Sequence, residues 1–253
     1  MKRSIFTMVT AMATITALNA AEPMVDKAKL QEIKAANKVL QNPTLHLIDA
    51  IEKPGSYFLK LEARSPRGSQ LLTAFLDKQT GELHIGTGYE KDGKPIFFPK
   101  DAKIIKEGVS FSYGKGSKEI YLVTDPECPY CSKFEKAAQG KLDAYRVHVI
   151  LFPLSFHKKA PAMAEWIMQG KDDAERKERF EQVMLHGSAK YQALIKDDKK
   201  PFVYSPAVKQ SIDRSSKAFM ELSARGTPAI FDANFEPLPI ETLLEAGKKK
   251  ENP

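Results

Sequence analysis

The spacing of apolar residues divides the chain into two parts of different texture. Between residues 23 and 40, apolar positions recur at loosely helical intervals among charged ones, which predicts an amphipathic helix. Further on, Tyr57–Ala63, Leu71–Leu76 and Leu83–Gly86 are short apolar and aromatic runs, and turn residues at 77–81 separate the last two. Such runs predict strands, the last two joined as a hairpin. The first part is therefore expected to be a small α+β unit.

In the second part, strand patterns alternate with helical ones. Ile120–Val123 and Val147–Leu154 are continuous apolar runs, typical of strands buried on both faces. Helical patterns are expected at 132–139, 161–169, 172–186, 205–225 and 240–246, with a short strand at 229–231. Ser205 and Pro206 suit the cap and first position of their helix, and the glycines at 140, 170, 187 and 226 suit helix ends. This part is expected to be an α/β domain.

The N-terminal stretch, 1–20, has the layout of a secretory signal peptide. Lys2 and Arg3 precede a mildly apolar run from Ile5 to Leu18, and small residues follow. The apolar run is too short to remain as a membrane anchor that spans the bilayer. We therefore expect residues 1–20 to be cleaved and the protein to be exported to the periplasm. An uncleaved amphipathic anchor is the alternative.

These patterns predict an α+β chain with two folded domains. We expect a signal peptide at 1–20, an N-terminal domain at 21–95, a linker at 96–117 and an α/β domain at 118–253. The linker is placed where Asp92-Gly93 and the prolines that follow interrupt the strand pattern.

Composition and charge narrow the class of protein. The chain has 253 residues, of which 42% are hydrophobic and 28% charged, as in a folded protein that is not integral to a membrane. Loss of residues 1–20 would lower the formal net charge from +7 to +5. The positive charges are dispersed, and the run Lys248–Lys250 is short and terminal. No nucleic-acid partner is expected.

The two cysteines, Cys128 and Cys131, form a Cys-Pro-Tyr-Cys motif and are the only ones in the chain. A structural disulfide stabilises mainly by closing a long loop, and this one would close only a very short ring. In an exported protein, a single and closely spaced cysteine pair is therefore better suited to thiol–disulfide exchange than to stabilising the fold as a structural disulfide.

The sequence around the pair predicts different roles for the two thiols. The strand at 120–123 leads into a helix that begins at the motif, so Cys128 would lie at a helix N-terminus, where free backbone N–H groups stabilise a thiolate. Pro129 suits the first helical turn. We expect Cys128 to be the exposed nucleophile and Cys131 the buried thiol that resolves a mixed disulfide.

Other readings of this region remain open. A CxxC pair can be half of a zinc site, for which His148 and His157 are the candidate partners, but the chain lacks a second CxxC. Asp125 and Glu127 could tune the dithiol or relay protons, or could be ordinary loop residues on a solvated rim. The rim interpretation is slightly favoured. No metal or other cofactor is expected.

A second motif, Gly226-Thr227-Pro228, directly precedes the short strand at 229–231. X–Pro bonds are the ones that readily become cis. A proline between a helix end and a strand is a plausible cis site, and the upstream strand–CxxC–helix unit strengthens that prediction.

Together, the run from Val123 to Cys131 and the Gly-Thr-Pro loop resemble the bacterial periplasmic disulfide isomerases of the DsbC/DsbG type. The resemblance covers about residues 120–247, with 160–225 similar to a helical insertion in the thioredoxin fold. It implies that Thr227-Pro228 is cis, faces the dithiol and binds substrate together with Pro129 and Tyr130. It also implies that the N-terminal domain is a cystatin-like dimerisation domain of a V-shaped homodimer.

Three functions follow from the motif and the resemblance. The first is a disulfide isomerase or reductase of misfolded or newly exported proteins, kept reduced by a DsbD-like membrane partner. The second is a dimeric oxidase that donates its disulfide and is reoxidised by a DsbB-like partner, because reduction potential and partner set the direction. The third is a holdase chaperone with secondary redox activity.

Overall fold

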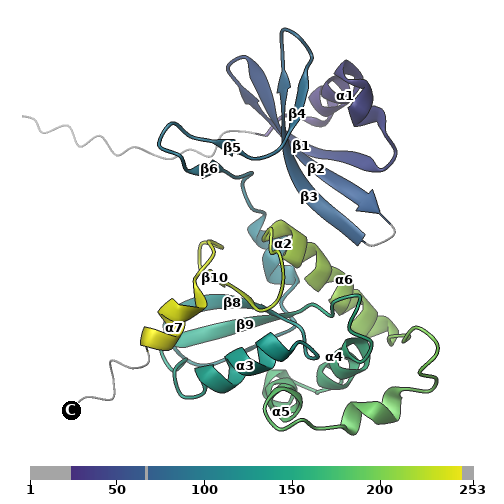
Figure 1. Cartoon of the computed structure of the whole chain (residues 1–253), viewed down its shortest axis with the longest axis vertical. Coiled ribbons are helices and arrows are strands. Elements are labelled where there is room, and N and C mark those ends of the chain that lie inside the picture. The colour runs from purple at the N-terminus through teal and green to yellow at the C-terminus, as the bar shows by residue number, and fades with distance from the viewer. Residues whose placement is uncertain (1–23, 66–67, 247–253) are drawn as a thin grey trace, which may run out of the picture.

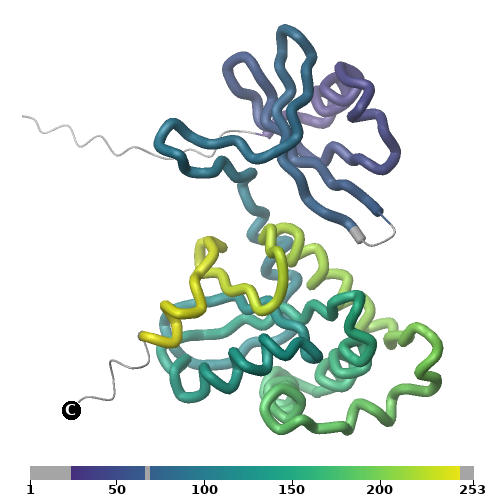
Figure 2. Tube along the Cα trace, viewed as in Figure 1, coloured from purple at the N-terminus to yellow at the C-terminus, as the bar shows by residue number. Residues whose placement is uncertain are grey.

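The computed structural model describes residues 24–65 and 68–246, which form two lobes joined by a short connection (Figure 1). The expected signal peptide, residues 1–20, lies outside the described residues. The path of the chain through the N-terminal lobe, the connection and the C-terminal lobe can be followed in Figure 2.

The N-terminal lobe is a helix packed against an antiparallel sheet. The sheet has the order β1-β2-β3-β4, and its inner face packs on α1 through Ile33, Leu59 and Leu61. The elements are α1 (Lys27–Ala36), the 3-10 helix η1 (Lys38–Gln41), β1 (Leu45–Lys53), β2 (Ser56–Ser65), β3 (Gly68–Asp77) and β4 (Leu83–Ile85). This confirms the small α+β unit.

Two details of this lobe differ from the sequence prediction. The helix expected over 23–40 is divided at Asn37, whose side chain accepts from Val39 N and donates to Gly81 O at 2.8 Å, so the chain starts a new turn there. Strand β1 was not predicted. Its register shifts between Leu47 and Asp49, and this bulge interrupts the alternation by which a half-buried strand is recognised.

The linker expected at 96–117 is longer than the connection that the structure contains between the two lobes. A small hairpin of β5 (Gly88–Tyr89) and β6 (Pro95–Ile96) ends the N-terminal lobe. Helix α2 (Ala102–Glu107) then packs in the C-terminal lobe through the fully buried Ile105, and β7 (Phe111–Tyr113) pairs with a strand of that lobe. Short elements such as these carry too little periodicity to be separated from a loop by sequence.

The C-terminal lobe is built on a four-stranded sheet of order β10-β8-β9-β7. Its centre is the parallel pair β8 (Lys118–Thr124) and β9 (Tyr145–Leu151), with β10 (Ala229–Asp232) antiparallel to β8. On one face, Ile120 and Leu122 pack with α3 (Pro129–Ala138) and α7 (Ile240–Ala246). On the other, Tyr121 and Val123 pack with α2 and α6 (Pro206–Glu221). The sheet is therefore covered on both faces, as its apolar strands predict.

Between β9 and α6, the chain inserts the helices α4 (Ala160–Met168), α5 (Asp173–Met184) and η2 (Lys190–Leu194).

Gly140 and Gly187 have the positive φ expected at helix ends, +70° and +63°. Gly170 does not. A Cβ there would lie 2.8 Å from the backbone nitrogen of Arg176, so this glycine permits close packing. Helix α6 ends at Glu221, before the predicted Gly226, and Ser223 adopts the left-handed conformation with φ 53°.

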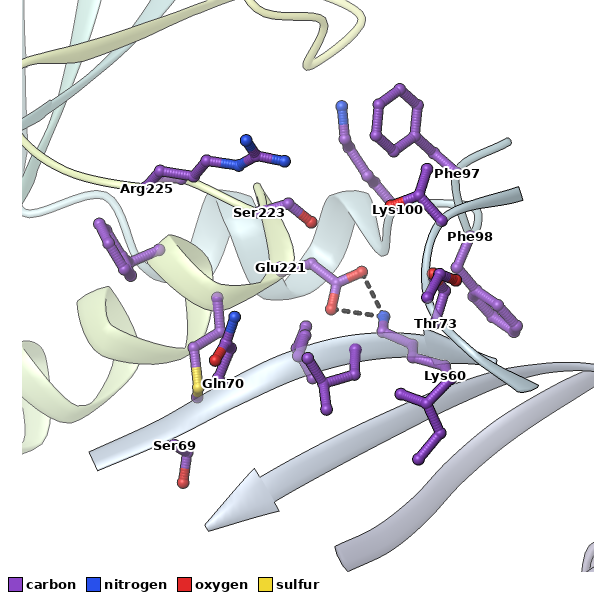
Figure 3. A pocket seen from close by; sticks show the side chains of 18 residues that line it. Lys60, Ser69, Gln70, Thr73, Phe97, Phe98, Lys100, Glu221, Ser223 and Arg225 are labelled. Carbon is purple, nitrogen blue, oxygen red and sulfur yellow. Dashed lines mark hydrogen bonds and ion pairs between the residues drawn. The ribbon is translucent and has the colours of Figure 1, made fainter. Parts of the chain in front are cut away.

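One buried ion pair links the two lobes. Lys60 Nζ of β2 lies 2.6 Å from Glu221 Oε1 at the end of α6, with the two side chains 12% and 5% exposed (Figure 3). Glu221 also accepts from the Asp101 backbone N–H in the connection at 2.7 Å. The charged pair is thus satisfied by a further hydrogen bond, which a buried pair requires.

Within the described ranges, no helix is long and apolar enough to cross a bilayer.

Candidate functional site

The dithiol lies where β8 leads into α3. Cys128 is the N-cap of α3, its carbonyl accepts from Ser132 N at 3.1 Å, and Pro129 occupies the first helical position. A turn closed by Cys128 N and Asp125 O, 3.1 Å apart, orients the chain into the helix. The backbone N–H groups of the first helical turn therefore face the region of Cys128, as the strand-to-helix pattern predicted.

Both thiols are buried, and for Cys128 this is more than the sequence predicted. Cys128 is 5% exposed and Cys131 is 0% exposed, and neither is in a disulfide here. Cys128 was predicted to be exposed, and the prediction was wrong, because the cis-proline loop lies against this residue. The order is as predicted, with Cys131 the more deeply buried thiol.

Burial dominates the chemistry of Cys131. It raises the pKa of this thiol to about 12, although the Asp125 N–H, 3.5 Å from the sulfur, and the nearby hydroxyls of Thr124 and Thr227 favour the thiolate. Those two hydroxyls are buried and have no other hydrogen-bond partner among the described residues. Cys131 is therefore a thiol, and not a thiolate, in the neutral pH range.

The Thr227-Pro228 peptide bond is cis, and it brings a backbone carbonyl to the reactive thiol. Cys128 Sγ lies 3.5 Å from Thr227 O. The structure thus brings Cys128, Cys131, Pro129, Thr227 and Pro228 together at one point of the fold. Tyr130 lies in the same turn but its side chain is directed to solvent and is 72% exposed.

Asp125 is fully buried beneath the dithiol, which excludes the solvated-rim interpretation for this residue. Its Oδ1 accepts from Glu127 N at 2.7 Å, and its Oδ2 accepts from Leu154 N at 2.6 Å. The same Oδ2 lies 2.9 Å from His157 Nδ1. The carboxylate therefore joins the active-site turn to the segment that follows β9.

Glu127 makes a second connection between the same segments. Its Oε2 accepts from the backbone N–H groups of Lys159 and Ala160, at 2.6 and 2.8 Å, at the start of α4. A carboxylate at a helix N-terminus satisfies free donors and interacts favourably with the helix dipole. Sequence reasoning assigned no such role to Glu127 and considered His157 only for zinc. The partners lie far apart along the chain, and no spacing rule connects them.

The two histidines considered as zinc ligands, His148 and His157, each contact a different part of the protein. His157 is paired with Asp125, whereas His148 lies on β9, 2.8 Å from Ser112 Oγ, with its ring stacked on Tyr121. Among residues 24–65 and 68–246, no group of three or more His, Cys, Asp or Glu side chains is placed to hold a metal ion.

Replacing Asp125 by asparagine is expected to destabilise the protein by about 2 kcal/mol, because an amide cannot accept all the hydrogen bonds made by the two carboxylate oxygens. The free energy of unfolding, obtained from urea denaturation, measures the effect. Asp143→Asn is the matched control, since Asp143 is exposed. Equal stability of the two variants would contradict a structural role for the Asp125 carboxylate.

The geometry suits thiol–disulfide exchange. A thiol at a helix N-terminus can act as a nucleophile, and the second thiol one turn away can displace it from a mixed disulfide. The cis-proline carbonyl beside Cys128 offers a backbone acceptor to a bound chain.

Comparison with known proteins agrees with this site. Residues 112–234 match the family model described as a thioredoxin-like domain. The chain is 23% identical over 216 residues to the thiol:disulfide interchange protein DsbG of Escherichia coli strain K12, across 79% of this chain and 82% of that protein.

Solved structures similar to this chain include thiol–disulfide proteins at low similarity. Proteus mirabilis ScsC in a transitional conformation has a TM-score of 0.45 and 14% identity, over 59% of this chain and 76% of that one. Helicobacter pylori DsbG has a TM-score of 0.38 and 12% identity, over 80% of this chain and 99% of that one.

The C-terminal lobe is thus a thioredoxin-like domain with a helical insertion. The chain as a whole is similar in sequence to the thiol:disulfide interchange protein DsbG, which is consistent with the DsbC/DsbG resemblance seen in the sequence.

Proposed function

We propose that this protein is a periplasmic disulfide isomerase or reductase that acts on misfolded or newly exported proteins. The observation that carries the proposal is the position of Cys128 at the N-terminus of α3, with the cis Thr227-Pro228 carbonyl 3.5 Å from its sulfur. A nucleophilic sulfur and a backbone acceptor for the client chain lie side by side there.

In the proposed reaction, the Cys128 thiolate attacks one sulfur of a client disulfide. A Cys128–client disulfide forms, and the other client sulfur leaves as a thiolate. In isomerisation, a client thiolate then attacks the mixed disulfide and releases Cys128. In reduction, the Cys131 thiol gives up its proton and its sulfur attacks Cys128 instead. The Cys128–Cys131 disulfide forms, the Cys128–client bond breaks, and the client sulfurs leave with that proton and one from solvent, so that the client disulfide is reduced to two thiols.

The surrounding residues receive roles consistent with this reaction. Pro129 and Tyr130 border the nucleophile, and the exposed Tyr130 ring offers an apolar contact to the client. Thr227 and Pro228 hold the client backbone beside Cys128. A homodimer through the N-terminal lobe and a DsbD-like membrane reductant complete the proposal, by analogy with the DsbC/DsbG type.

The redox state of the pair in the native periplasm tests the direction of the reaction. Acid quenching followed by alkylation with a large maleimide separates the dithiol from the disulfide by electrophoretic mobility. A mainly reduced pair is expected, and deletion of the DsbD-like reductant should oxidise it. A mainly oxidised pair would contradict the isomerase proposal. It would favour an oxidase whose dithiol is reoxidised by a DsbB-like partner.

A further inference from the structure

We propose that Arg225 forms a subsite for an acidic side chain of the client polypeptide, in a groove that runs from the cis-proline loop toward the N-terminal lobe. The inference rests on the proposed function and specifies the clients that this site prefers. It assigns specificity to a residue outside the dithiol turn.

The groove consists of two adjoining cavities. One, of about 570 Å³, is lined by Pro228, Ile230 and the segment 237–241. The other, of about 260 Å³, lies between the end of α6 and strand β3 of the N-terminal lobe (Figure 3). Both are lined by Phe97, Lys100, Ser223, Ala224 and Arg225. The two cavities therefore adjoin at these residues, and the two together are called the groove.

The larger cavity reaches the cis-proline loop, which lies against the reacting sulfur. Pro228 lines the larger cavity, and the carbonyl of the preceding Thr227 is the atom 3.5 Å from Cys128 Sγ. A client chain joined to Cys128 through a disulfide can therefore continue directly into the groove. Residues close in sequence to the attacked client cysteine would lie at its centre.

The wall near Pro228 is mainly apolar. Ile230, Leu238 and Pro239 line it, and Phe97, which is 52% exposed, lies at the junction of the two cavities. Apolar client side chains can be buried there, which provides affinity with little sequence selectivity. Selectivity has to come from the polar groups at the centre.

The charged groups at the centre leave one cation available. Lys100 donates to Phe235 O and lies 3.4 Å from Glu236 Oε1, and Glu221 is neutralised by Lys60. Arg225 is exposed, and the described part of the chain places no carboxylate against its guanidinium. Figure 3 shows this guanidinium directed over Ser223 toward the side of the pocket that holds Lys100 and Phe97.

These surroundings favour a carboxylate. A guanidinium binds a carboxylate through two parallel hydrogen bonds, and Arg225 has no carboxylate partner within the described residues. The acidic residue that lines the far end of the larger cavity, Glu241, disfavours a second client carboxylate there. The preferred client thus carries one Asp or Glu close to its reactive cysteine, beside apolar residues.

The test uses the reduced full-length protein and a series of synthetic peptides. Each peptide is extended and apolar and contains one cysteine in a mixed disulfide with 2-mercaptoethanol. Asp, Asn or Lys is placed in turn at each of the four positions on either side of that cysteine. The second-order rate constant for release of the peptide thiol is measured at low and high salt.

At one or two of these positions, the Asp peptide is expected to react about three to ten times faster than the Asn peptide, and the Lys peptide more slowly than the Asn peptide. High salt should reduce these differences in rate because it screens the charges. Arg225→Glu should reverse the order, so that the Lys peptide reacts fastest. Arg225→Gln should remove the preference, so that the Asp, Asn and Lys peptides react at similar rates. Arg146→Gln, which removes an exposed arginine outside the groove, should keep the preference of the parent protein.

The outcomes separate the subsite from the proposed function. If every peptide reacts but Asp, Asn and Lys give equal rates at all positions, the subsite is wrong and the exchange activity stands. If the preference persists in Arg225→Gln, another residue is responsible and the assignment to Arg225 is overturned. If no peptide reacts, the proposed function itself is wrong.

Discussion

Cys128→Ser is expected to abolish thiol–disulfide exchange, with a rate loss of at least about a thousandfold, because hydroxyl oxygen does not replace a thiolate in attack on a disulfide. Cys131→Ser should behave differently. Its Cys128 can still attack, but nothing within the protein resolves the product, so client proteins should accumulate as mixed disulfides with it. Reductase turnover of a protein disulfide, with non-reducing electrophoresis of the trapped complexes, measures both effects.

The two variants also separate the expected roles of the cysteines. Alanine at position 131 should trap clients as serine does, which excludes an effect of the serine hydroxyl. Trapping by Cys128→Ser, with no trapping by Cys131→Ser, would show that the nucleophile and the resolving thiol had been interchanged. Loss of folding is checked by comparing the unfolding midpoints of the variants with that of the reduced parent protein.

Glu135→Gln is expected to stabilise the protein at alkaline pH. Glu135 lies on α3, is 7% exposed, and has one buried side-chain oxygen, Oε1, for which residues 24–65 and 68–246 supply no hydrogen-bond partner. Burial, and next the nearby Glu181 carboxylate, raise its pKa to about 8, although Lys177 opposes this. Tyr113, Lys115 and Asp143 line the same cavity as Glu135, and the charge of Glu135 contributes to raising the pKa of the Tyr113 phenol.

The direction of the effect follows from the raised pKa. Between the ordinary value of 4.5 and the folded value of about 8, the folded protein binds more protons at Glu135 than the unfolded chain does. The free energy of unfolding therefore falls as pH rises through this range. The loss is at most about 5 kcal/mol, since one pKa unit corresponds to about 1.4 kcal/mol. Glutamine cannot ionise and removes this dependence.

Urea denaturation at intervals from pH 4.5 to 9 measures the difference between Glu135→Gln and the parent protein. The difference should be small at the acid end and should grow toward pH 8. Glu178→Gln, on the exposed side of α5, is the matched control and should show no such trend. A constant difference across the range would be incompatible with a raised pKa of Glu135 in the folded protein.

The sequence was most informative where a signal is local. The CxxC spacing, the apolar strand before it and the helical pattern after it follow one another directly along the chain, and together they predicted the strand–dithiol–helix unit that the structure contains. The apolar runs of β8 and β9 predicted a sheet covered on both faces. The Gly-Thr-Pro motif marked a bond at which cis is accessible, and together with the upstream CxxC unit and the family resemblance it predicted the cis bond that the structure contains.

The sequence was least informative where residues distant along the chain meet. Strand β1 was missed because its bulge obscures the alternation, and α2 and β7 were assigned to the linker because their packing partners lie far away in the sequence, on α6 and β9. Likewise, no pattern within the sequence pairs Asp125 with His157, or connects Glu127 to the start of α4.

By itself, the sequence determined the chemistry available to this protein, namely two thiols at a helix start and a proline loop before a strand. Only the tertiary structure decided how that chemistry is surrounded. It placed Thr227 O against Cys128, buried Cys131 and Asp125, and turned Arg225 toward the groove between the lobes. The physical reason is that burial, and therefore the electrostatic environment of each group, depends on elements that come together only when the sheet and its helices pack.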